Sequence, residues 1–205
     1  MAVLKRRLIL LGVCLLLPVA FMPLVLADAQ QSGEAAAQKL LLRASADNTQ
    51  EQINMGIMYL RGRDVEANPE QAFYWMEKAA QNGSAEAEYY LSLFYEDGLG
   101  VNEPDLALAM KWLRQAADHD YAYASYELGL AYLAGKIGSV DAQQGALWLD
   151  KAAREGVVRA QRQLASLYEQ GIGVAQNTDS AMYWYRQAGS RGDEGALKAL
   201  RSLQN

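Results

Sequence analysis

The chain contains a single histidine, and its neighbours are the first place to look for chemistry. His119 stands between Asp118 and Asp120. An imidazole beside carboxylates could bind a metal ion or act as a general base. A zinc site needs about three or four ligands, usually several His or Cys, and a catalytic Ser–His pair needs a third group that orients the imidazole. Neither set surrounds His119, so we interpret it as a solvated loop residue and predict no metal site and no catalytic residue.

Other signatures of enzymes are weaker still. The segments 98–100 and 171–173 read Gly-Leu-Gly and Gly-Ile-Gly, but they lack the downstream lysine or third glycine of a phosphate-binding loop. Their repetition indicates that they terminate helices. Acidic residues are numerous, 24 in all, yet no two stand out from solvated helix faces as a glycosidase pair would. We therefore expect no enzyme activity and no cofactor.

Four tryptophans set a period that most of the chain follows. They stand 37, 36 and 36 residues apart, and tyrosines, glycines and pairs of small residues keep nearly the same spacing. The columns are Trp75, Trp112, Trp148 and Trp184; Tyr59, Tyr95, Tyr132 and Tyr168; Gly62, Gly98, Gly135 and Gly171; and Ala79-Ala80, Ala116-Ala117, Ala152-Ala153 and Ala188-Gly189. A period of about 36 residues is typical of stacked units that bury their apolar faces against one another. Tryptophans in this register could stack on sugars, but their helical spacing favours a place in the core.

Each unit is predicted to contain two helices. In the second half, the tryptophan and its small neighbours form one helical stripe, and a strong N-cap residue stands seven positions before each tryptophan. These caps are Asn68, Asp105, Asp141 and Asn177. In the first half, a small residue three positions before each tyrosine lets the neighbouring helix approach closely. The glycine three positions after the tyrosine ends that helix in a left-handed conformation. No strand is required.

These columns resemble the Sel-one-like repeat family (SLR), a branch of the tetratricopeptide-like α-solenoids. The match is to A-x-x-x-L-G-x-x-Y, then G-x-G-V, then D-x-x-x-A-x-x-W-x-x-x-A-A-x-x-G, best preserved at 95–101 and 168–174. The fold we expect is an all-α superhelix, a solenoid of four hairpins at 49–84, 85–121, 122–157 and 158–193. Degenerate capping helices are expected at 28–48 and 194–205. The resemblance implies a scaffold or adaptor, since exported bacterial members look like helpers of envelope machinery. Its motif residues are structural, so they carry over no binding residue.

The first 27 residues predict export. Basic residues at positions 5–7 precede an apolar run from Leu8 to Leu26, and Ala27 offers a cleavage position before Asp28. We expect residues 1–27 to be a cleaved signal peptide and the mature chain to be periplasmic or secreted. The alternative is an uncleaved inner-membrane anchor with the repeats facing the periplasm, since the run approaches the roughly 20 residues that span a bilayer.

Charge and cysteine content narrow the partners. Without residues 1–27 the chain keeps 16 basic residues against 24 acidic ones, a net charge of −8. Such a surface repels phosphate backbones, so we expect no nucleic-acid partner. The only cysteine, Cys14, lies in the apolar run, so the mature chain has no disulfide and no cysteine metal ligand.

The first helices of the units carry the predicted binding face. In hairpin solenoids these helices line the concave surface, which is the usual binding surface. Tyrosine and arginine are enriched at binding hot spots. The candidates are the variable positions Glu86, Tyr90, Tyr123, Glu127 and Arg159. Tyr90 and Tyr123 lie outside the structural columns, so we expect them to have no role in the core.

Two functions remain open at this stage. We expect a non-catalytic scaffold that binds a protein partner through the concave face, where tyrosines beside carboxylates would suit a basic or polar peptide. The alternative is a carbohydrate-associated helper that binds peptidoglycan or an exported polysaccharide through the same tyrosines. A face that is merely solvated would explain these residues too.

Overall fold

The computed structural model describes residues 38–42, 44 and 48–204, and every regular element in these ranges is a helix. Residues 38–42 and 44 are helical and precede α2. The following helices are α2 (Thr49–Arg61), α3 (Pro69–Gln81), α4 (Ala85–Asp97), α5 (Leu106–Asp118), α6 (Ala122–Ala134), α7 (Ala142–Arg154), α8 (Val158–Gln170), α9 (Thr178–Ser190) and α10 (Glu194–Gln204). The signal-peptide prediction for 1–27, and most of the predicted capping segment 28–48, lie outside the described residues. Within those ranges, no helix combines the length and apolar character needed to cross a bilayer.

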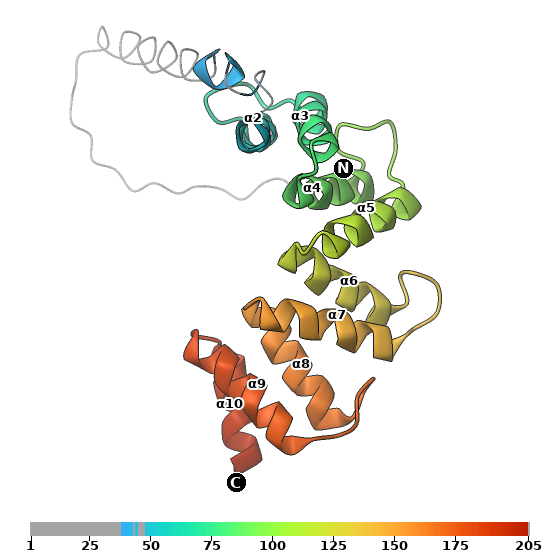
Figure 1. Cartoon of the computed structure of the whole chain (residues 1–205), viewed down its shortest axis with the longest axis vertical. Helices are drawn as coiled ribbons and strands as arrows, with labels where there is room; N and C mark the ends of the chain where they lie inside the picture. The colour runs from blue at the N-terminus through green and yellow to red at the C-terminus, as the bar shows by residue number, and fades with distance from the viewer. Residues whose placement is uncertain (1–37, 43, 45–47, 205) are drawn as a thin grey trace, which may run out of the picture.

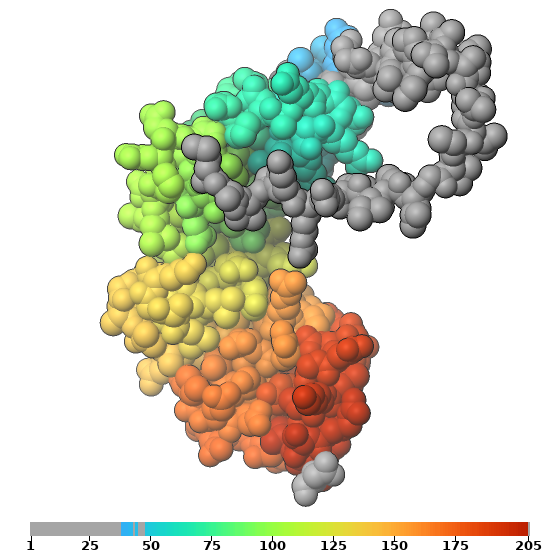
Figure 2. Space-filling view, turned by 180° about the vertical axis from the view of Figure 1, so that it is seen from behind, coloured from blue at the N-terminus to red at the C-terminus, as the bar shows by residue number. Residues whose placement is uncertain are grey.

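The helices stack in chain order into an elongated solenoid. All extensive contacts join helices that are adjacent in sequence, from α2 against α3 to α9 against α10 (Figure 1). Seen from behind, the repeats form successive layers in the order of the chain (Figure 2). The predicted all-α solenoid is therefore confirmed.

Capping residues determine where the helices begin and end. The four predicted N-cap side chains each accept a backbone N–H three residues on, at 2.9 to 3.0 Å. The four glycines that end the first helices adopt φ between 63° and 70°, the left-handed region that disfavours other residues. Both predicted columns are confirmed.

Small residues allow the two helices of a repeat to touch. A Cβ atom at Gly56 would lie 2.7 Å from the side chain of Met76, and one at Gly129 would lie 2.8 Å from that of Leu149. The tryptophans pack less completely than predicted. Trp75 is buried, whereas Trp112, Trp148 and Trp184 are partly buried because each covers the edge of a core cluster. These three thus belong to the core only in part.

The second glycine of each Gly-x-Gly loop has a separate role. A Cβ at Gly100 would lie 2.3 Å from the carbonyl oxygen of Pro69, and one at Gly173 would lie 2.0 Å from that of Ala142. These loops therefore dock on the first turn of the second helix in the preceding repeat. The interpretation of these segments as helix terminators alone is wrong for their second glycines. In the third repeat, Ile137 stands at the equivalent position and packs against the core cluster that contains Leu113 and Leu128.

Candidate partner-binding site

Four tyrosine rings lie against one another where α4 and α6 begin. Tyr89 and Tyr90 belong to α4, Tyr121 is the N-cap of α6, and Tyr123 lies in its first turn. The ring centroids are 5.2 Å apart for Tyr89 and Tyr121, 6.1 Å for Tyr89 and Tyr90, and 6.0 Å for Tyr121 and Tyr123. These distances fall in the range of favourable aromatic pairs. This tyrosine cluster links the second repeat to the third.

The two predicted tyrosines differ in their surroundings. Tyr123 is 58% exposed and free to contact a partner. Tyr90 is partly buried and packs against the core cluster that contains Ile53 and Phe94. The expectation that Tyr90 has no role in the core is wrong, because its ring lies along the seam between the first and second repeats.

Glu86 supplies the charge beside the cluster. Burial, and then the negative charge of Glu86, raises the pKa of Tyr121 above its ordinary value. The same two causes raise the pKa of Tyr90, although Arg61 acts in the opposite direction. The phenol groups therefore stay neutral and can donate hydrogen bonds beside a carboxylate.

A cavity of about 220 Å³ adjoins the cluster between α4 and α6. We call it the α4–α6 cavity. Tyr89 and Leu93 line it from α4 and Leu130 lines it from α6, while α5 contributes the buried Leu113. The cavity therefore lies between the first helices of consecutive repeats.

Three charged residues also line the α4–α6 cavity. Lys136 Nζ donates to Glu96 Oε1 at 2.9 Å, and both side chains are exposed to solvent. Glu127 is partly buried, and its pKa is raised by burial and by Glu96, while Lys136 and Arg159 lower it less strongly. The Glu127 carboxylate is thus poorly compensated by its neighbours.

The five residues chosen from sequence fall into three places. Glu86, Tyr90 and Tyr123 lie at the tyrosine cluster, and Glu127 lines the α4–α6 cavity. Arg159 is exposed on α8 and does not line the cavity, but its charge reaches Glu127. Tyr89 and Tyr121 also belong to the cluster and were not among the predicted residues. A signal was present, because both stand within two residues of the chosen tyrosines.

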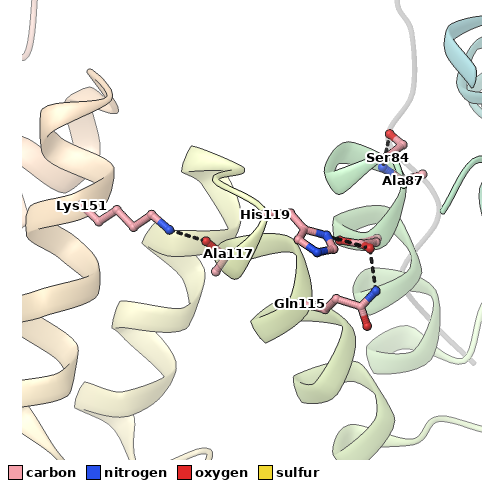
Figure 3. Close-up of polar contacts among 7 residues, drawn as sticks. Ser84, Ala87, Gln115, Ala117, His119 and Lys151 are labelled. Atoms are coloured by element: carbon pink, nitrogen blue, oxygen red, sulfur yellow. Dashed lines mark hydrogen bonds and ion pairs between the residues drawn. The ribbon is translucent and has the colours of Figure 1, made fainter. Parts of the chain in front are cut away.

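His119 contacts a buried carboxylate in α4. Glu88 in α4 is 1% exposed and accepts a hydrogen bond from Gln115 Nε2 at 2.6 Å. His119 Nδ1 lies 2.8 Å from Glu88 Oε2, and Figure 3 shows both side chains converging on α4. The interpretation of His119 as merely solvated is incomplete, since one ring nitrogen holds a buried carboxylate. Across the described residues, no group of three His, Cys, Asp or Glu is placed to hold a metal.

Glu88 belongs to a column of buried polar side chains. Gln52 and Gln161 occupy the equivalent positions, and each donates to a backbone carbonyl of the preceding repeat, that of Ala44 or Ala153. At the third position, Ser125, the corresponding carbonyl of Ala117 is bonded by Lys151 Nζ at 2.6 Å (Figure 3). These contacts join repeats and serve structure, so they lie outside the candidate site.

Comparisons with known proteins agree with this architecture. The Sel1 repeat family matches at residues 52–84, 85–121, 122–157 and 158–193. The crystal structure of a Sel1 repeat protein from Oxalobacter formigenes is 39% identical with a TM-score of 0.78, over 82% of this chain and 48% of that one. A protective antigen present in uropathogenic Escherichia coli strains, which displays an SLR fold, is 30% identical with a TM-score of 0.74, over 78% of this chain and 34% of that one.

A curated relative carries a functional name. Chitin synthase regulatory factor 3 of Schizosaccharomyces pombe is 37% identical over 140 residues, which is 66% of this chain but only 15% of the relative's own length. Sel1 repeat proteins are protein-interaction scaffolds and generally non-catalytic adaptors. Four matched repeats and the shared solenoid fold show that this chain belongs to the Sel1 repeat family.

Proposed function

We propose that this protein is a non-catalytic scaffold that binds a protein partner through the first-helix face of its second and third repeats. The observation that carries the proposal is the tyrosine cluster, which spans two repeats, adjoins the α4–α6 cavity through Tyr89 and ends in the exposed Tyr123. Tyrosines bury much apolar area on binding while losing little side-chain entropy, which explains their enrichment at hot spots. The relative's name, chitin synthase regulatory factor 3, supports a role in controlling another enzyme.

Export to the cell envelope is part of this proposal. Its support is the basic flank, the long apolar run and the small residues that end at Ala27. A periplasmic or secreted scaffold in that place would assist an envelope assembly. An uncleaved anchor would leave the repeats on the same side of the inner membrane.

The test is partner capture by variants with one exposed tyrosine removed. Tyr123→Ala removes the exposed end of the cluster, and Tyr183→Ala is the matched control because Tyr183 is 50% exposed on α9, away from the cluster. Each tagged protein is cross-linked in cells and purified with whatever it binds. We expect the parent and Tyr183→Ala to recover the same protein in equal yield. Loss of about 2 kcal/mol at a hot spot weakens binding about 30-fold, so Tyr123→Ala should recover little of it. Equal recovery by both variants would place the binding surface elsewhere.

The alternative proposal, binding to peptidoglycan or an exported polysaccharide, rests on the same exposed rings. The poorly compensated Glu127 in a small cavity favours a polypeptide, because a cationic side chain would neutralise its charge, whereas glycan hydroxyls could only donate hydrogen bonds to it. Co-sedimentation with purified peptidoglycan separates the two. Sedimentation of the parent that Tyr123→Ala abolishes, without any captured protein, would support the carbohydrate function.

A further inference from the structure

The α4–α6 cavity has room for one side chain rather than for a whole small molecule. Its volume is about 220 Å³, whereas sites for drug-sized ligands occupy roughly 300–1,000 Å³. The cavity adjoins the tyrosine cluster through Tyr89, which belongs to both. A polypeptide bound over the cluster would therefore carry one of its side chains past the opening.

The walls of the cavity suit a long aliphatic stem. Leu93 and Leu130 line it from facing helices, and Leu113 contributes a buried surface. Tyr89 adds an aromatic ring to the α4 wall. Lysine and arginine bury their methylene stems against such surfaces and keep the charged group at the polar end, and both cations interact favourably with aromatic rings.

The charge of the cavity distinguishes between possible side chains. Glu96 is paired with Lys136, whereas Glu127, which lines the same cavity, has no hydrogen-bond or ion-pair partner among the described residues. An acidic side chain would be repelled by the two carboxylates. An apolar side chain would displace water from Glu127 without replacing the hydrogen bonds that the water donates, which is unfavourable for a partly buried charge. A cation offsets both effects.

We infer that the α4–α6 cavity is a subsite for one arginine or lysine side chain of the polypeptide partner, with Glu127 as its counter-charge. This inference rests on the proposed function, since it assumes that the partner is a polypeptide lying across the tyrosine cluster. Glu127 would determine the preference for a cation, and the tyrosines would contribute the rest of the binding free energy.

The direct test uses small probes instead of the partner. N-acetyl-argininamide and N-acetyl-lysinamide are titrated into isotope-labelled protein, and NMR follows the methyl groups of Leu93 and Leu130. N-acetyl-norleucinamide supplies a similar stem without the charge. We expect saturable shifts with the two cationic amides, with dissociation constants on the order of 1 mM, and at least about 10-fold weaker shifts with norleucine. Equal shifts with norleucine, or none with the cations, would overturn the inference.

Two variants assign the effect to Glu127. Glu127→Gln keeps the shape of the side chain and removes its charge, so binding of the cationic amides should weaken about 10-fold or more. Glu155→Gln removes an exposed charge at the end of α7, outside both the cavity and the tyrosine cluster, and should leave their binding unchanged. Helical circular dichroism checks that both variants fold. If Glu127→Gln binds like the parent, Glu127 is not the counter-charge and the inference fails.

The outcomes separate this inference from the proposed function. Failure of the amides to bind, with partner capture still lost in Tyr123→Ala, refutes the subsite and leaves the scaffold function in place. Binding of the amides in a protein whose partner capture does not depend on Tyr123 refutes the proposed surface instead.

Discussion

Replacing Gly173 by alanine tests the docking of a loop on the preceding repeat. Gly173 has φ +70°, and its added Cβ would lie 2.0 Å from the carbonyl oxygen and 2.4 Å from the carbonyl carbon of Ala142. Ordinary van der Waals contact for such atoms is 3.4–4 Å. The neighbour is helix backbone, which cannot rotate away as a side chain does. The loop must therefore move off the first turn of α7.

The expected loss of stability in Gly173→Ala has two parts. Placing alanine in the left-handed region costs about 1–2 kcal/mol, offset by about 0.4–1 kcal/mol from the less flexible unfolded chain. Forcing the loop away from α7 adds about 1–3 kcal/mol, the usual range for overpacking. We expect Gly173→Ala to lower the free energy of unfolding by about 2–4 kcal/mol, measured by urea denaturation with helical circular dichroism.

Gly83→Ala is the matched control for this prediction. Gly83 has φ +82°, but no atom lies within 4 Å of its Cβ position. The substitution therefore carries only the backbone part, a net loss of about 1 kcal/mol. If the two variants unfold at the same urea concentration, the loop does not dock on α7 as described, and the argument from close approach is refuted.

Two further predictions concern the tryptophans and Glu127. Trp75→Ala removes a buried ring and should lower the free energy of unfolding by about 3–5 kcal/mol. Trp148→Ala removes a partly buried ring and should lower it by about half as much. Equal losses for the two variants in chemical denaturation would contradict their different burial. The raised pKa of Glu127 means that the folded protein binds this proton more tightly than the unfolded chain does. Its contribution to stability is therefore fully present below the unfolded pKa of about 4.3 and is lost as pH rises through the folded pKa. Glu127→Gln should accordingly gain stability relative to the parent between about pH 4 and pH 7, and an unchanged difference across that range would show that burial does not disfavour the charge.

The hairpins could be predicted from sequence because their signals are local and repeated. The side chains of Asn68 and its equivalents accept a hydrogen bond from the N–H three residues away, and Gly62 and its equivalents end a helix through their own left-handed backbone conformation. Their effect does not depend on how one repeat packs on the next. Periodicity then supplies each helix with the same neighbours four times.

The candidate site was harder to predict because it depends on the angle between repeats. Tyr90 packs into the core and Tyr123 points outward because they occupy different positions of the first helix, Tyr123 in the first turn of α6 and Tyr90 one turn later in α4. The Tyr89 and Tyr121 rings meet across two repeats. The contact between Glu88 and His119 joins residues 31 positions apart and replaces the amide found at Gln52. Neither of these contacts between repeats follows from the spacing within one unit.

The position of the α4–α6 cavity has a mechanical consequence. Its lining comes from α4, α5 and α6, so it belongs to the second and third repeats together. The extensive contact between these two repeats is that of α5 with α6. A molecule held in the cavity would touch both repeats, so we expect it to stiffen the solenoid at this junction. Tension along the solenoid would in turn alter how firmly that molecule is held.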